Sequence, residues 1–193
     1  MHATTQAPGV RQAKLAAASA ISLVAAPAQV RTDCERTASE LHYPVSCPAL
    51  FPREGIPTPI IAGPCKGKFR GRYLHPGCDG AARYAFSSID FPAQSRLGHL
   101  VFLGTPVIES ALNAVYAPIS PPVHQLAVVS RARIGSSLAE CVRVPRGSDS
   151  AFGGHLVWVW DVRGHTYAVG FHGYDDASRI SGLHFARATV IVP

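Results

Sequence analysis

The length, composition and charge of the chain exclude several classes of protein. With 193 residues, of which 47% are hydrophobic, it has the size of one domain and enough apolar side chains for a core, which excludes a wholly disordered protein. No apolar run reaches about 18 residues, which excludes a polytopic membrane protein. The 17 glycines and 16 prolines argue against a long-helix bundle, and the net charge of +6 is too mild to require a nucleic acid partner.

The first 28 residues have the three parts of a secretory signal. Arg11 and Lys14 precede the apolar stretch 15–26, and Ala26-Pro27-Ala28 has the small residues of a cleavage site. We therefore predict a signal peptide at 1–28 and a secreted or extracytoplasmic protein associated with the cell envelope. No integral membrane span is expected after its removal, and export argues further against nucleic acid as a partner. An uncleaved N-terminal helix or anchor is the alternative.

All five cysteines follow this signal, and outside the cytosol they are expected to pair. Two pairs have the same spacing, 13 residues, and a bridge across a loop of that size stabilises by about 3 kcal/mol. The favoured bridges are Cys65–Cys78, first, and Cys34–Cys47. Cys141 is then either the unpaired cysteine, buried in a strand, or the partner of an early cysteine.

A metal site is the rival interpretation of the second pair. Cys65, His75 and Cys78 offer three ligands, but no second motif supplies the fourth that a structural zinc ion requires. We therefore predict no metal, and no motif indicates a cofactor.

Residues 29–82 are predicted to form a disulfide-stabilised arm rich in proline and glycine. A polar helical or extended segment at 29–41 leads into 43–64, where regularly placed prolines favour an extended arm packed on something else. A basic loop follows at 65–78.

The basic loop alternates cations with glycine and aromatic residues, so that an extended chain carries its cations on one side. If Cys65 and Cys78 close it, the loop becomes a basic ribbon suited to an anionic polymer or a lipid headgroup. A solvated strand face that prevents edge aggregation is the alternative. The cations of the ribbon are Lys66, Lys68, Arg70 and Arg72.

Residues 83–193 are predicted to form an α+β domain. Short alternating segments indicate strands, and Pro106 and the pair Asp175-Asp176 are placed to begin two short helices, the second weakened by Gly182. The predicted strands lie at 83–91, 99–103, 123–134, 138–144, 155–162, 165–171 and 188–192, and the predicted helices at 106–114 and 176–187. The expected architecture is a mostly antiparallel sheet of five to six strands with one or two short covering helices.

The strands around 155–171 are predicted to form a hairpin with a three-residue loop in which Gly164 is left-handed. If Asp161 faces His165, Trp158 lies opposite Ala168 and Trp160 opposite Thr166. Both indoles then cover small residues. Such a stripe is either core beneath a helix or a stacking platform for a flat ligand.

The segment Gly154–Gly173, the helix after it and Thr189-Val-Ile-Val-Pro193 resemble the C-terminal unit of secreted actinobacterial α+β proteins, and Cys47-Pro48 is similar to their early Cys-Pro. A more distant similarity is to lipoprotein-carrier-like sensor domains, in which a curved antiparallel sheet cups a helix. The resemblance implies export and α+β architecture, and it supplies no catalytic residue. Gly182 within the helix departs from the pattern.

Three functions are consistent with these observations. A non-catalytic binding module at the cell envelope, recognising an anionic polymer or headgroup through the basic ribbon, is favoured. A carrier of a small apolar ligand or lipid would require an apolar cavity beside Trp158 or Trp160. A secreted hydrolase would require a cleft that joins histidine, aspartate and serine or cysteine, although the usual catalytic motifs are absent.

Overall fold

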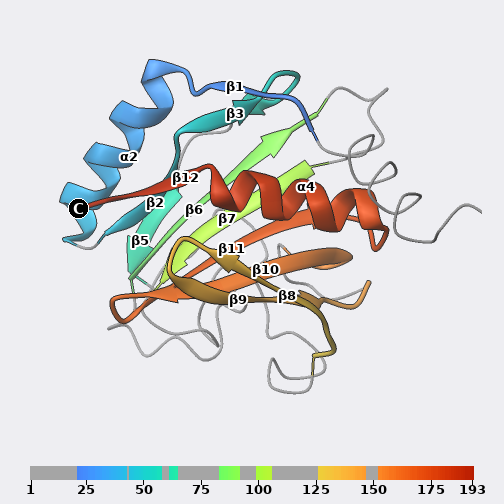
Figure 1. Ribbon diagram of the computed structural model, residues 1–193. Helices are drawn as coiled ribbons and strands as arrows, with labels where there is room; N and C mark the ends of the chain where they lie inside the picture. Colours follow the sequence, from blue (N-terminus) through green and yellow to red (C-terminus); the bar gives the residue numbers. More distant parts are fainter. Residues whose placement is uncertain are drawn as a thin grey trace, which may run out of the picture.

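An antiparallel sheet forms the centre of the fold (Figure 1). The computed structural model describes residues 21–42, 44–57, 61–64, 83–91, 99–105, 126–146 and 152–193. Within these ranges the central sheet has eight strands in the order β4-β6-β7-β11-β10-β9-β8, with β5 also paired to β6. They are β4 (Ile56–Pro57), β5 (Ile61–Pro64), β6 (Arg83–Asp90), β7 (His99–Thr105), β8 (Val128–Ile134), β9 (Ser137–Arg143), β10 (His155–Val162) and β11 (His165–His172).

Two helices and two small sheets complete the described part of the chain. Helix α4 (Asp176–Arg187) crosses one face of the central sheet, and α2 (Ala28–Leu41) lies beside the small sheets (Figure 1). One small sheet pairs β1 (Leu23–Ala25) with β3 (Leu50–Pro52), and the other pairs β2 (Val45–Pro48) with β12 (Thr189–Val192).

The predicted α+β class with a mostly antiparallel sheet is confirmed, but the predicted size of five to six strands is wrong. The difference comes from the proline-rich arm, since β4 and β5 both pair with β6. Short, proline-containing strands are suited to a sheet edge, where a missing N–H breaks no ladder. The arm and the predicted domain 83–193 are thus joined through paired strands.

The N-terminal elements include part of the predicted signal peptide. Residues 23–25 form β1, and α2 begins at Ala28, the last residue of the predicted signal. The side chain of Ile21 is buried in the core. Cleavage after Ala28 would therefore remove β1 and Ile21 from the fold. The segment predicted as a helical or extended lead-in is the helix α2.

The β10–β11 hairpin has a different register from the predicted one. Val162 pairs with His165, which leaves a loop of two residues, and both loop residues have positive φ: 51° at Arg163 and 80° at Gly164. Two-residue loops of this kind match the right-handed twist of the strands. An arginine tolerates this conformation poorly, so its residue type does not by itself indicate a turn of this kind.

The shift of one residue changes the partners of both tryptophans. Trp158 lies opposite Val169 and Trp160 opposite Tyr167, with the Trp160 and Tyr167 ring centroids 6.0 Å apart. Helix α4 covers this face closely at Gly182, where an added Cβ would lie 3.1 Å from Trp158 Cδ1. The glycine that weakens the helix in isolation is therefore what allows the helix to approach the sheet.

Candidate anion-binding site

The structure places the sequence-predicted binding residues in two groups. The basic ribbon, Lys66, Lys68, Arg70 and Arg72, lies outside the described residues. Trp158 and Trp160 are 0% and 3% exposed, and Trp158 Nε1 donates a hydrogen bond of 2.8 Å to the Arg179 carbonyl of α4. Both indoles are buried in the core, Trp158 beneath α4 and Trp160 against Tyr167, so neither provides an open ring face on which a ligand could stack.

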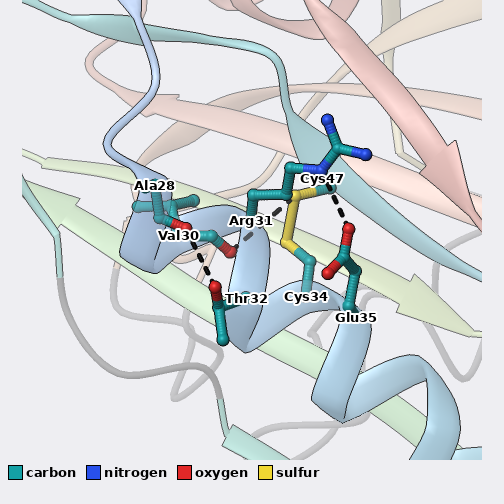
Figure 2. The surroundings of a disulfide bond; sticks show 7 residues. All are labelled: Ala28, Val30, Arg31, Thr32, Cys34, Glu35 and Cys47. Atoms are coloured by element: carbon teal, nitrogen blue, oxygen red, sulfur yellow. Dashed lines mark hydrogen bonds and ion pairs between the residues drawn. A yellow bond between two sulfur atoms is a disulfide. The ribbon is translucent and has the colours of Figure 1, made fainter.

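The Cys34–Cys47 disulfide is confirmed (Figure 2). It joins α2 to β2 with a Cα–Cα distance of 5.9 Å, and both cysteines are buried. Figure 2 shows the bridge on the inner side of α2, with the Arg31–Glu35 ion pair on the same helix. Cys65 and Cys78, the pair that was favoured first, lie outside the described residues.

Cys141 is unpaired and fully buried in β9. This confirms the first of its two predicted states, an unpaired cysteine buried in a strand. Burial raises the pKa of its thiol to about 12 from the ordinary value of 9.0. Cys141 is therefore a core residue and is unsuited to act as a nucleophile. Burial has the same effect on the Tyr167 hydroxyl, whose pKa it raises to about 12.

We expect the Cys141 thiol to resist alkylation by iodoacetamide at pH 8 in the native protein and to react on unfolding, with the modified peptide identified by mass spectrometry. Because the folded state holds the thiol proton more tightly, this group's contribution to stability is fully present below about pH 9 and is lost between about pH 9 and 12. Rapid native modification at Cys141 would contradict its burial.

A cationic and aromatic cluster lies where β9 and β11 end. The guanidinium carbon of Arg143 is 4.9 Å from the ring centroid of Tyr174, and that of Arg146 is 5.3 Å from the same centroid. Both arginines are exposed and Tyr174 is half-buried. Two cations thus share one aromatic ring at the surface, and we call these three residues the arginine–tyrosine cluster.

Main-chain contacts hold this cluster in place. Tyr174 Oη donates a 2.6 Å hydrogen bond to the Val144 carbonyl, which fixes the ring against the end of β9. Gly154 has a φ of 79°, which favours glycine, and it lies beside Arg146 and His172: an added Cβ would lie at van der Waals distance, 3.5 Å from Arg146 Cγ and 3.4 Å from His172 Cε1. The stem of Arg146 and the exposed His172 ring therefore lie near the same glycine.

The acidic residues next to the cluster have other partners. Asp175 accepts a 2.8 Å hydrogen bond from the Ser178 amide as the N-cap of α4, and Asp176 forms a 3.0 Å ion pair with Arg179. Within the described ranges no carboxylate forms an ion pair with Arg143 or Arg146. Among the described residues, the cluster thus presents to solvent two positive charges that have no ion-pair partner.

Sequence reasoning did not find this cluster. Arg143 and Arg146 follow one another around Pro145, which identifies them only as surface cations near a strand end. Tyr174 comes from beyond the β10–β11 hairpin, and no local pattern joins it to them. Only the pairing of β10 with both β9 and β11 brings the three together.

A pocket of about 540 Å³ at the far end of the hairpin tests the hydrolase hypothesis. Ser137, Asp161 and His165 all line it. Ser137 Oγ donates to the Asp161 carbonyl, however, and Asp161 Oδ1 accepts a 2.6 Å hydrogen bond from Thr166. The serine and the carboxylate are thus engaged in hydrogen bonds other than those of a nucleophile–base–acid relay.

A second groove, of about 560 Å³, runs between the start of α2 and the β2–β12 pair. Neither this groove nor the hairpin-end pocket is lined by Trp158 or Trp160. In the part of the chain that the structure describes, no three histidine, cysteine or acidic side chains are gathered as metal ligands. None of the described helices is long and apolar enough to cross a membrane.

Comparisons with known proteins return no match among family models, curated proteins or solved structures. The resemblance to secreted actinobacterial proteins therefore stays a prediction.

Proposed function

We propose that the protein is an exported, non-catalytic binding module of the cell envelope that recognises the phosphate groups of an anionic polymer or a lipid headgroup. The observation that supports this proposal best is the arginine–tyrosine cluster, in which two guanidinium groups lie over one ring with no carboxylate partner among the described residues. The basic ribbon at 66–72 is a second proposed contact for the same ligand.

Arginine suits this ligand for geometric reasons. Its planar guanidinium donates two parallel hydrogen bonds to a phosphate, and it is more weakly hydrated than an ammonium group. Stacking on Tyr174 restricts the two side chains before the ligand arrives, which lowers the entropy lost on binding. Each cation near an anionic membrane surface contributes about 1 kcal/mol.

Export remains part of the proposal. The Cys34–Cys47 bridge supports it, because structural disulfides persist in oxidising compartments and are rare in the cytosol. The predicted signal peptide at 1–28 supports it from the sequence.

Replacing both cluster arginines by serine (R143S/R146S) is expected to weaken binding to vesicles of phosphatidylglycerol and phosphatidylcholine by about 2 kcal/mol, or roughly 30-fold. The measurement is co-sedimentation at several salt concentrations, since the contribution of surface charges falls with ionic strength. A polyphosphate column eluted with salt distinguishes a soluble polymer from a headgroup.

The matched control is R31S/R36S, which removes the same charge from two exposed arginines of α2 that already form ion pairs with acidic residues. It should bind within about twofold of the unmodified protein. Equal losses in both double variants would reduce the effect to net charge and would contradict a site at the cluster. The variant K66S/K68S/R70S/R72S tests the ribbon separately.

A further inference from the structure

An exposed histidine lies beside the arginine–tyrosine cluster. His172 is the last residue of β11, two positions before Tyr174. A Cβ added to Gly154 would lie 3.4 Å from His172 Cε1 and 3.5 Å from Arg146 Cγ, so the imidazole and the arginine stem border the same point. A charge on the imidazole therefore acts on an anion at the cluster over at most about the Debye length, ~10 Å at 0.1 M salt.

Main-chain hydrogen bonds fix this arrangement. The Gly154 amide donates a 3.2 Å hydrogen bond to the carbonyl of Pro145, which precedes Arg146. The Gly173 amide, which follows His172, donates a 2.9 Å hydrogen bond to the Gly154 carbonyl. The segments that carry the arginines, the histidine and the tyrosine are thus joined through one glycine before any ligand binds.

The neighbouring strands place two other histidines next to His172. His155 is its cross-strand partner on β10, with the ring centroids 5.0 Å apart, and it is 1% exposed. On the other side β7 begins at His99, one residue before the Leu100–Phe171 pair, and the His99 side chain lies outside the described part of the structure. Of the two described imidazoles, His172 is the one that meets solvent.

The charged groups around His172 come from two further segments. The two cluster arginines follow β9, and Asp175 and Asp176 stand at the start of α4, where the cap and the pair with Arg179 engage them. An anion bound at the cluster attracts a proton to His172, because opposite charges favour the charged form. By linkage, protonated His172 strengthens binding of that anion to the same degree.

We infer that His172 is a third, pH-dependent cation of the arginine–tyrosine cluster, which binds phosphate groups more tightly as the pH falls. The change takes place where an imidazole takes up a proton, between about pH 8 and 5. This inference rests on the proposed function, since it concerns the same site and the same ligand.

The test is co-sedimentation of the full chain with vesicles of phosphatidylglycerol and phosphatidylcholine at pH 8 and pH 5.5, at one salt concentration. The phosphodiester keeps its single negative charge at both values, so a change in affinity comes from the protein. We expect at least about fivefold tighter binding at pH 5.5, the effect of one added cation. H172Q, which stays neutral, should bind normally at pH 8 and lose about fivefold of this gain.

Two further variants distinguish a charge at His172 from a general effect of protonated histidines. H172K keeps a cation at both pH values, so it should bind about fivefold tighter than the unmodified protein at pH 8. H184Q removes an exposed imidazole from the last turn of α4 and should keep the gain within about twofold. Thermal unfolding at pH 8 should be the same in all of these proteins, which shows that they are folded.

An equal gain at pH 5.5 in H172Q and in the unmodified protein would overturn the inference. Binding that is weakened in R143S/R146S at pH 8 but is insensitive to pH would overturn it too, while leaving the proposed function in place. Binding that does not depend on the two arginines at either pH would contradict the proposed function, and the inference with it.

Discussion

Replacing Trp158 by alanine is expected to lower the free energy of unfolding by about 3–5 kcal/mol, the range for large aromatic residues removed from a packed core. The side chain is 0% exposed, lies against α4 at Gly182, and donates its indole N–H to the Arg179 carbonyl. The helix approaches too closely for another side chain to fill the space. Reversible urea unfolding followed by circular dichroism measures the loss.

Two further variants separate packing from hydrogen bonding. W158F keeps most of the apolar volume and loses the N–H donor, so its cost should be nearer 1–2 kcal/mol. The control L138A removes a leucine that is 62% exposed on the neighbouring strand β9, and it should change stability by less than about 0.5 kcal/mol. If W158A were no more costly than L138A, Trp158 would not be a core residue and the stacking-platform hypothesis would regain support.

Removing the Cys34–Cys47 bridge with the double variant C34A/C47A is expected to lower the free energy of unfolding by about 3 kcal/mol, because the 13-residue loop is no longer closed in the unfolded chain. Alanine is preferred to serine, since both positions are buried and a hydroxyl there would need its own partner. Urea unfolding with and without reductant measures the effect.

The variant C65A/C78A is the matched comparison, because its two cysteines have the same spacing as Cys34 and Cys47. Reductant should destabilise C65A/C78A, which keeps the Cys34–Cys47 bridge. Intact mass with and without reduction counts the bridges in each variant, and in secreted material it also locates the N-terminus relative to Ala28. Reduction without any loss of stability in C65A/C78A would contradict a structural role for this bridge.

Local patterns predicted most of the described central strands and the helix that Asp175 caps, because alternation and capping act over a few residues. Local patterns failed at one turn and also where distant segments decide the outcome. The hairpin register depended on Arg163 accepting a left-handed conformation, which its residue type disfavours. The strand at 189–192 was expected from its composition, but its partner, β2, lies far away in the sequence.

The candidate site, like the fold, was predictable from the sequence only in part. The basic character of the chain was evident from its composition, whereas the positions at which positive charge is left uncompensated depended on which carboxylates the fold engages elsewhere. Asp175 and Asp176 adjoin Tyr174 in the sequence and would neutralise nearby arginines if they were free. The cap of α4 and the pair with Arg179 engage them instead.

The sequence by itself determined the α+β class, most of the described strands of the central sheet and the spacing that allows Cys34 and Cys47 to pair. Only the tertiary structure decided that both tryptophans are core, that Cys141 is sealed in a strand, and that Arg143 and Arg146 share the ring of Tyr174. The physical reason is the separation along the chain over which each kind of interaction acts. Backbone preferences and side-chain alternation act between near neighbours, while burial and charge compensation depend on every element that packs against a residue.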